Sequence, residues 1–399
     1  MSEEFYRIKR LPPYVIAEVN GMRAAARAAG RDIIDLGMGN PDLPPPAHVI
    51  EKLCEVAMKP DAHGYSASKG IPGLRKAQAN YYGRRFGVEV DPESEVVMTM
   101  GSKEGLASLA TAITAPGDVV LAPNPSYPIH TFGFIIAGAT IRSVPTTPDE
   151  NYFRALERAM AFTVPRPSIL IVNYPSNPTA ETVDLAFYER LVAWAKENQV
   201  WVISDLAYSE LYYDGNPTVS ILQVPGAKDV AIEFTSLSKT FSMAGWRVGF
   251  AVGNPRLIAA LTRVKSYLDY GAFTPIQAAA CAALNGPQDI VESNRALYQK
   301  RRDVLVESFG RAGWHIPSPR ASMFAWAPLP PALKDMGSLE FSKQLLTHAE
   351  VAVAPGVGYG EEGEGYVRIA LVENEQRLRQ AARNVRRYLQ SMGINSSAA

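Results

Sequence analysis

Between about residues 50 and 285, short apolar runs alternate with segments of helical periodicity. The runs are rich in Val and Ile and apolar throughout, as strands buried on both faces of a sheet are. The segments between them repeat apolar residues every three to four positions. This alternation predicts an α/β fold, a three-layer, mostly parallel sheet with helices on both faces. Six runs are predicted as strands: Glu95–Met100, Val119–Ala122, Ser168–Asn173, Val200–Asp205, Val230–Thr235 and Val248–Gly253.

The pattern changes near residue 290. A long polar helix is predicted over Asp289–Arg311, followed by short alternating strands at Phe324–Ala327 and Tyr366–Leu371 and by a last amphipathic helix. The first 45 or so residues, bounded by prolines, are predicted as an arm. The predicted division is therefore a large domain and a smaller, discontinuous α+β domain: 50–290, and 1–49 with 291–399.

The charge balance limits the classes of partner. Lys+Arg and Asp+Glu number 40 each, so no basic excess indicates nucleic-acid binding. No apolar run approaches the ~18 residues of a membrane span, and no signal peptide is visible. Cys54 and Cys281 lie far apart and outside any Cys/His cluster, so we expect reduced thiols, a cytoplasmic location and no metal site.

Two motif matches have simpler explanations. Gly358–Gly363 fits GxGxxG, but two Glu occupy the place of a pyrophosphate and a strand follows, so a flexible loop is favoured over a dinucleotide site. Ser236–Lys239 fits SxxK, the nucleophile motif of penicillin-binding enzymes. The SDN and KTG boxes of those enzymes are missing, and an acyl-serine hydrolase with Ser236 as nucleophile is kept only as a remote alternative.

Ligands of doubly wound sheets bind beyond the carboxyl ends of the strands. Gly101, Ser102 and Lys103 follow one predicted strand and open a helix, which makes a phosphate cradle possible. Ser102 as a plain helix cap explains the same residues equally well.

Polar residues also follow two further strands. Asn177 lies between two prolines, where an ordinary turn residue is the simpler reading. Asp205 ends an apolar strand and needs a partner, because burying an unpaired carboxylate is costly, and Tyr208 lies three residues on.

The next strand leads into Ser236-x-Ser238-Lys239, with Arg247 eight residues after the lysine. This stretch resembles the cofactor-lysine motif of the fold type I, pyridoxal-phosphate-dependent aminotransferases. Further motifs of that family occur in the same order along nearly the whole chain: Gly39-Asn-Pro-Asp42, Tyr65 with Gly70-x-x-Gly73-Leu-Arg75, Asn177-Pro-Thr, Asp205-x-x-Tyr208 and Arg368.

Within the family, the chain most resembles the bacterial alanine (glutamate–pyruvate) aminotransferases. The stretches RLPPYV, NPSYPIH, SNPTA, KSYLDYGAFTPIQ and GSLEF carry this closer similarity. Methionine, aspartate and LL-diaminopimelate aminotransferases share much of it and remain alternatives. Ala180 departs from the pattern, because many relatives have Gly there.

The resemblance implies the cofactor pyridoxal 5'-phosphate and a role for each matching residue. Lys239 would bind the cofactor covalently and act as general base, and Asp205 would pair with the pyridinium nitrogen. Tyr208 and Asn177 would donate to the ring oxygen, and Tyr127 would stack on the ring. Six residues would hold the phosphate: Gly101, Ser102, Lys103, Ser236, Ser238 and Arg247.

The resemblance also implies which residues bind the substrate and that two subunits share each active site. Arg368 would clamp the substrate α-carboxylate, with Gly39 and Asn177 nearby. Tyr14 and Tyr270 are further candidates for the substrate side-chain pocket. Tyr65 would reach the cofactor phosphate of the other subunit, which implies a homodimer with shared active sites.

The expected activity, in amino-acid biosynthesis, is ping-pong transfer of an amino group between an L-amino acid and a 2-oxo acid. The preferred pairs are alanine with pyruvate and glutamate with 2-oxoglutarate. Because fold alone does not fix reaction, a lyase on the same scaffold is a further alternative. A transcription regulator built on this domain is disfavoured, because only a short arm precedes Gly39 and the chain has no basic excess.

Overall fold

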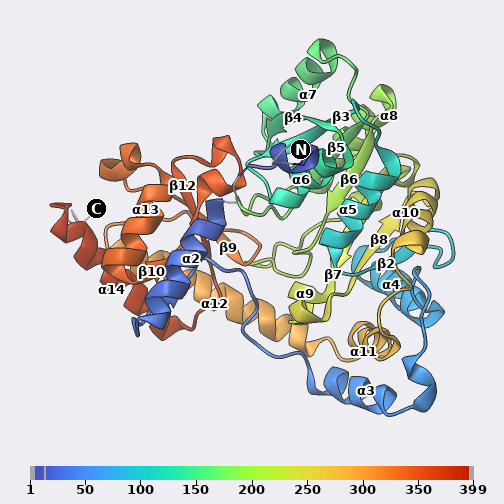
Figure 1. The fold of residues 1–399 in the computed structure, drawn as a ribbon, viewed down its shortest axis with the longest axis horizontal. Coiled ribbons are helices and arrows are strands. Elements are labelled where there is room, and N and C mark those ends of the chain that lie inside the picture. Colours follow the sequence, from blue (N-terminus) through green and yellow to red (C-terminus); the bar gives the residue numbers. More distant parts are fainter. Residues whose placement is uncertain (1–4, 13–14, 395–399) are drawn as a thin grey trace.

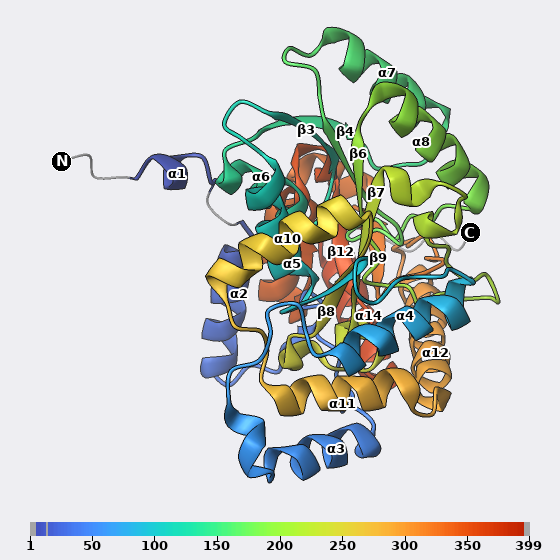
Figure 2. The same ribbon diagram turned by 90° about the vertical axis from the view of Figure 1, so that its right-hand side faces the viewer.

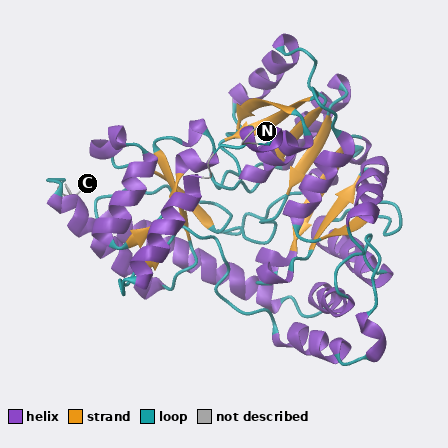
Figure 3. Cartoon of the chain, viewed as in Figure 1, coloured by secondary structure: helices purple, strands orange, loops and turns teal. Residues whose placement is uncertain are grey.

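A seven-stranded sheet forms the centre of the larger part of the molecule (Figures 1 and 3). The structure is a computed structural model and describes residues 5–12 and 15–394. Among the described strands of this sheet, β8 (Gly249–Gly253) is antiparallel to both of its neighbours, and the other adjacent pairs are parallel. In order across the sheet, the strands are β2 (Val96–Thr99), β8 (Gly249–Gly253), β7 (Ala231–Ser236), β6 (Trp201–Asp205), β5 (Ile169–Asn173), β3 (Val119–Asn124) and β4 (Thr140–Pro145).

Helices cover both faces of this sheet, which confirms the predicted α/β layering. Side chains alternate along each strand. In β5, Ile169 and Ile171 join one hydrophobic core, whereas Leu170 and Val172 join the other. The first core includes α5 (Ser102–Ile113), α6 (Pro128–Ala137) and α10 (Pro255–Leu268). The second includes α3 (Ala47–Ala57), α4 (Pro72–Phe86), α7 (Glu150–Phe162), α8 (Leu185–Asn198) and α11 (Thr274–Asn285).

All six strands predicted for this sheet are present, and none of their ends differs from the prediction by more than two residues. The strand β4 was not predicted. It lies at the edge of the sheet beside β3, and most of its side chains are at least partly exposed. An edge strand exposed in this way lacks the continuous apolar run that identified the others.

The smaller part has its own core and sheets, on the left of Figure 1. Its antiparallel sheet has the order β11–β12–β9, and β1 pairs with β10 in parallel. The strands are β1 (Ile34–Asp35), β9 (Phe324–Pro328), β10 (Val351–Ala352), β11 (Ala354–Pro355) and β12 (Tyr366–Ala370). The helices are α12 (Asp289–Arg311), α13 (Ser338–Gln344) and α14 (Glu375–Ser391).

The predicted arm contains two helices, α1 (Tyr6–Lys9) and α2 (Val15–Ala28), which were not predicted. The second half of α2 is rich in Ala and Arg, both strong helix formers, so local propensity supplies the helix. Ile34 and Leu36 then enter the core of the smaller part.

Helix α12 runs between the two parts of the molecule. Val291 near its start packs in the core of the larger part, and Leu305 and Phe309 pack in the core of the smaller part. The turned view shows α3, α4 and α11 gathered below the sheet (Figure 2). No helix in the described part of the chain combines the length and apolar character that a membrane crossing requires.

Short helical turns complete the chain. The turn α9 (Leu237–Thr240) follows β7 directly. The others are η1 (Pro60–His63), η2 (Ile221–Gln223), η3 (Ala227–Asp229), η4 (Ala244–Trp246), η5 (Pro331–Met336), η6 (Leu345–Ala349), η7 (Gly356–Tyr359) and η8 (Glu361–Gly363).

Candidate active site

A cavity of about 350 Å³ lies at the carboxyl ends of the central strands. Asn173, Asp205 and Ser236 end β5, β6 and β7 respectively, and all three line it. Phe324 of β9 and Arg368 of β12 line it from the smaller part. The cavity therefore lies where parallel α/β sheets bind ligands, and both parts of the molecule contribute to it.

Lys239 extends into this cavity from α9. Its Nζ donates a hydrogen bond to the carbonyl of Gly39, 2.7 Å away. Burial, then the positive charges of Arg368 and Arg247, lower the pKa of Lys239 to about 8. A substantial share of this amine is therefore neutral near physiological pH, as a nucleophile or a general base must be.

Asp205 is a buried carboxylate, and only one of its two oxygens has a hydrogen-bond partner among the described residues. Its Oδ2 lies 2.8 Å from Nε2 of His130. Its Oδ1 is also buried and has no hydrogen-bond partner among the described residues. A buried carboxylate oxygen without a partner is costly, so this atom can accept a hydrogen bond from a cationic N–H group in the cavity.

His130 was not singled out by the sequence analysis. It is fully buried in α6 and meets the ring of Tyr127 edge-on, with centroids 6.0 Å apart. The sequence carries no local signal for His130, because its partner Asp205 lies 75 positions away.

Asn177, Tyr208 and Arg368 form one hydrogen-bonded group. Arg368 Nη1 donates to Asn177 Oδ1 at 2.9 Å, and Asn177 Nδ2 lies 3.4 Å from the hydroxyl of Tyr208. Burial raises the pKa of Tyr208, so its hydroxyl stays protonated and can donate. Asn173 links this group to Asp205. Its Nδ2 donates to the backbone carbonyl of Asp205, and its Oδ1 accepts from the backbone N–H of Asn177.

Arg368 is buried and held against two aromatic rings. Its guanidinium carbon lies 3.9 Å from the ring centre of Phe324 and 4.9 Å from that of Tyr359. Its Nη2 donates to the carbonyl of Gly37, but Nε has no partner in the described part of the chain. An anion in the cavity could complete the hydrogen bonding of this guanidinium.

The start of α5 presents a candidate anion-binding surface to the same cavity. Ser102 and Lys103 line it, and Gly101 precedes them with a left-handed φ of 80°. A Cβ at Gly101 would lie 2.1 Å from Nη2 of Arg247, so only glycine lets the arginine approach this turn. Helix N–H groups, hydroxyls and a guanidinium together suit a phosphate.

Ser236 and Ser238 belong to the same surface. Both line the cavity, and Ser236 Oγ accepts the backbone N–H of Ser238 to cap α9. This contact gives Ser236 a capping role and leaves the hydrolase alternative without support. The Gly358–Gly363 loop forms η7 and η8 ahead of β12, as expected of a loop rather than a dinucleotide fingerprint.

Tyr127 lines the cavity on the α6 side. The ammonium of Lys103 lies 5.7 Å from its ring centre. Burial, then the nearby Asp205, raises the pKa of Tyr127. Its ring is thus a neutral flat surface beside the polar groups.

Two predicted residues do not line this cavity, and a third falls outside the described part of the chain. Tyr65 and Tyr270 contact each other, with ring centroids 4.8 Å apart, but are 90% and 65% exposed on the surface. Tyr14 lies outside the described residues. All other predicted site residues line the cavity except Gly101, which adjoins it through Ser102.

Comparisons with known proteins agree with this geometry. The chain is 53% identical to the glutamate-pyruvate aminotransferase AlaC of Escherichia coli over 98% of this chain and 95% of the relative. It is 43% identical to an LL-diaminopimelate aminotransferase of Moorella thermoacetica, over 97% and 98% of the two chains.

Solved structures show the same architecture. A double mutant of the Thermus thermophilus aspartate aminotransferase superposes with a TM-score of 0.89 at 29% identity, over 98% of this chain and 100% of that chain. Residues 31–385 match the family described as aminotransferase class I and II. The predicted family is confirmed: this chain belongs to the class I and II aminotransferases.

Proposed function

We propose that this protein transfers an amino group between alanine and 2-oxoglutarate, yielding pyruvate and glutamate, with pyridoxal 5'-phosphate as cofactor. One observation carries the proposal. A lysine whose pKa is lowered to about 8, a buried carboxylate oxygen without a partner, an anion-binding helix start and a buried arginine share one cavity. Each supplies a function that cofactor-dependent transamination requires.

The residues fit the proposed cofactor. The unpartnered Oδ1 of Asp205 suits the protonated pyridine nitrogen, and the turn made by Gly101 suits its phosphate. When bound, pyridoxal phosphate supplies an electron sink for the electrons of a broken substrate bond. Around the phosphate, Ser102, Lys103, Ser236, Ser238 and Arg247 would donate hydrogen bonds.

Three residues would orient the ring. Tyr127 would stack on one face, and the hydroxyl of Tyr208 and the amide of Asn177 would donate to the ring oxygen. His130 would hold the Asp205 carboxylate in place through its 2.8 Å contact. Asp205 thereby remains an acceptor aimed into the cavity.

Arg368 would bind the substrate α-carboxylate. Its hydrogen bonds to Asn177 and Gly37 fix the guanidinium plane before a substrate arrives. A fixed fork of donors orients a carboxylate as well as attracting it. The substrate Cα–H would then point toward the lysine.

Lys239 would move the proton. As a neutral amine, Lys239 Nζ can accept the proton of the substrate Cα and later return one. Burial and the two arginines keep its pKa near 8, so the neutral form is accessible without strong base.

The choice of alanine and glutamate is supported by the relatives. AlaC of Escherichia coli is named a glutamate-pyruvate aminotransferase and is 53% identical. The LL-diaminopimelate aminotransferases, 43% identical in the Moorella case, support the runner-up substrate class.

The working form would be a cytoplasmic homodimer. Tyr65 and Tyr270 protrude together on one surface, where a second copy could receive them. Tyr65 would then reach the cofactor phosphate of the partner subunit. Within each chain, 50–290 would act as the large domain, and 1–49 with 291–399 as the smaller one that closes over it.

A scan of amino donors tests this function. The protein, loaded with pyridoxal phosphate, is mixed with each common amino acid in turn, and the visible absorption band of the cofactor is followed. Alanine and glutamate should discharge the band fastest, and the Lys239→Ala variant should discharge it with none. Fastest reaction with diaminopimelate, methionine or aspartate would reassign the substrate, and a protein that never acquires the band would contradict the proposed function.

A further inference from the structure

Lys265 is a buried lysine outside the proposed reaction. It lies in α10 and is only 1% exposed. Its Nζ is 2.9 Å from Oδ2 of Asp269 and 3.3 Å from Oε2 of Glu104. A buried ammonium needs such partners, and the three side chains, here called the Lys265 triad, carry one net negative charge.

Glu104 connects the triad to the start of α5. It lies in the first turn of that helix, and its Oε2 accepts the backbone N–H of Met100 at 2.8 Å. Met100 immediately precedes Gly101 and Ser102, the turn that forms the anion-binding surface. Lys265, by holding Glu104, therefore helps to fix the shape of this turn.

The charge of Glu104 matters as well as its position. A carboxylate in the first turn of a helix competes with any other anion for the positive end of the helix dipole. Lys265 offsets that negative charge at hydrogen-bond distance. Without the lysine, Glu104 would repel a phosphate bound at Ser102.

Asp269 connects the triad to the protruding tyrosines. Its Oδ1 accepts the backbone N–H of Gly271 at 2.7 Å, and its carbonyl accepts the hydroxyl of Ser68. Tyr270 lies between Asp269 and Gly271, and its ring packs on Tyr65. The same lysine thus fixes the segment that would reach the partner's phosphate.

We infer that Lys265 is a positioning residue for phosphate binding. It shapes and neutralises the start of α5 through Glu104, and it holds the Tyr65–Tyr270 pair through Asp269. The inference rests on the proposed function, because the anion it concerns is the cofactor phosphate. It assigns Lys265 no contact with substrate or cofactor.

The test compares two ligands that differ only in the phosphate. The full-length protein is freed of cofactor, and the dissociation constants of pyridoxal phosphate and pyridoxal are measured by absorbance. Lys265→Met should weaken the affinity for pyridoxal phosphate by about 10-fold, which corresponds to about 1.4 kcal/mol, because Glu104 then repels the phosphate without compensation. Pyridoxal should bind as before.

Lys196→Met is the matched control. Lys196 forms an ion pair of similar length with Asp229, at 2.8 Å, but on the surface and outside the lining of the cavity. This variant should bind both ligands like the wild type.

A second variant keeps the test valid if Lys265→Met does not fold. The double variant Lys265→Met, Glu104→Gln removes the positive charge of Lys265 and the negative charge of Glu104 together. The side-chain oxygen of the glutamine can still accept the backbone N–H of Met100. The affinity of the double variant for pyridoxal phosphate should return to within about 3-fold of the wild type. An affinity of the double variant about 10-fold or more below that of the wild type would overturn the electrostatic role.

Two results separate this inference from the proposed function. Wild-type protein that binds neither ligand would contradict the proposed function itself. Wild-type protein that binds both, with a Lys265→Met variant that loses both equally or neither, would overturn only the role of Lys265.

Discussion

At the scale of single residues, the surroundings of Lys239 decide what this lysine can do. Ordinary lysines are charged at neutral pH. Burial and the charges of Arg368 and Arg247 lower the pKa of Lys239 to about 8, and the Gly39 carbonyl fixes its Nζ. The two arginines that would bind anions thus also favour the neutral form of the Lys239 amine.

The lowered pKa of Lys239 predicts how the rate of pyridoxal phosphate binding depends on pH. The cofactor-free protein should capture pyridoxal phosphate faster as pH rises through about 8, because only the neutral amine of Lys239 attacks an aldehyde. Arg368→Leu removes one cause of the lowered pKa, so the midpoint should move to higher pH. Stopped-flow absorbance measures both.

Arg377→Leu provides the control for that shift. Arg377 pairs with Asp32 at 2.7 Å and does not line the cavity. Its loss should leave the midpoint in place. An Arg368→Leu midpoint equal to the wild type would show that Arg368 does not act on Lys239.

The sequence identified some site residues and missed others for a physical reason. Lys239 and Asp205 could be predicted because they stand in local motifs at the ends of apolar strands. His130 and Lys265 could not, since their importance comes from contacts with residues 75 and 161 positions away. Such contacts exist only once the chain is folded.

At the scale of elements, the turn from β2 into α5 is the most constrained piece of the site. Gly101 has a left-handed φ of 80°, and a Cβ there would lie 2.1 Å from Arg247 Nη2. The turn and the arginine are therefore fitted to each other.

Gly101→Ala should weaken pyridoxal phosphate binding by about 10-fold or more, because Arg247 must move away from the phosphate site. Gly117→Ala is a matched control, since φ there is 96° and no described atom lies within 4 Å of a Cβ. It should lower stability by about 1 kcal/mol and leave affinity unchanged. Equal affinities for the two variants, measured by absorbance titration, would count against the fitted turn.

Ala180, the one departure from the family pattern noted in the sequence, lies in the turn after Asn177. Its φ is 60°, in the left-handed region where many relatives place Gly, and its side chain is buried. The turn after Asn177 therefore accommodates a Cβ in this conformation. In this turn, Asn177 is hydrogen-bonded to Arg368 and Tyr208.

The elements themselves were predictable to different degrees. Interior strands and α12 could be predicted because continuous apolar runs and helical periodicity are strong local signals. The edge strand β4 and helix α2 could not, because one lacks the apolar run and the other lies in a segment that reads as an arm.

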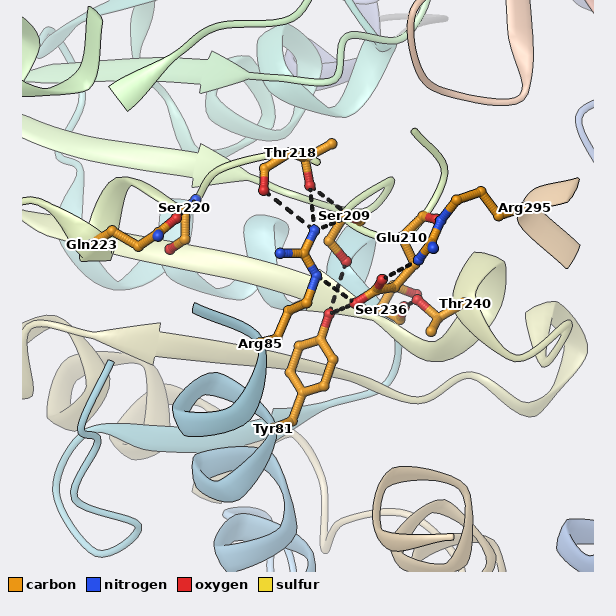
Figure 4. Close-up of polar contacts among 10 residues, drawn as sticks. All are labelled: Tyr81, Arg85, Ser209, Glu210, Thr218, Ser220, Gln223, Ser236, Thr240 and Arg295. Atoms are coloured by element: carbon orange, nitrogen blue, oxygen red, sulfur yellow. Dashed lines mark hydrogen bonds and ion pairs between the residues drawn. The ribbon is translucent and has the colours of Figure 1, made fainter. Parts of the chain in front are cut away.

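At the scale of the whole molecule, a polar cluster around Glu210, whose members do not line the cavity, joins the two parts (Figure 4). Glu210 accepts from Tyr81 and Arg85 of α4 and from Arg295 of α12. The ring of Tyr212 lies beneath both arginines. Because α12 spans both cores, this cluster ties the orientation of the smaller part to the larger one.

Glu210→Gln should lower the free energy of unfolding by about 2 kcal/mol, because two guanidinium groups lose a buried carboxylate. Urea denaturation measures the change. Glu307→Gln, in an exposed pair with Arg311, should change it by less than about 0.5 kcal/mol. Similar losses for both would show that the cluster adds no special stability.

The proposed homodimer with shared active sites leads to a further prediction about the assembly. The protein should have twice the 43.4 kDa mass of one chain in light scattering. Mixed dimers of Tyr65→Ala and Lys239→Ala chains should regain activity, because one of their two sites would have both Lys239 and the partner's Tyr65 intact. If Tyr65 serves its own subunit, no site is restored and mixing gives no gain.

The chain has zero net charge, but positive side chains outnumber negative ones in the lining of the cavity. Lys103, Lys239, Arg247 and Arg368 line the cavity, and Asp205 is the one carboxylate among its lining residues. A site of this kind suits a ligand with a phosphate and a carboxylate.

The most direct test of the account is to find which lysine holds the cofactor. The protein is incubated with pyridoxal phosphate, reduced with borohydride, digested and mapped by mass spectrometry. We expect a pyridoxyl group on Lys239, with the label lost in the Lys239→Ala variant. Labelling of another lysine, such as Lys103, or no specific labelling would contradict it.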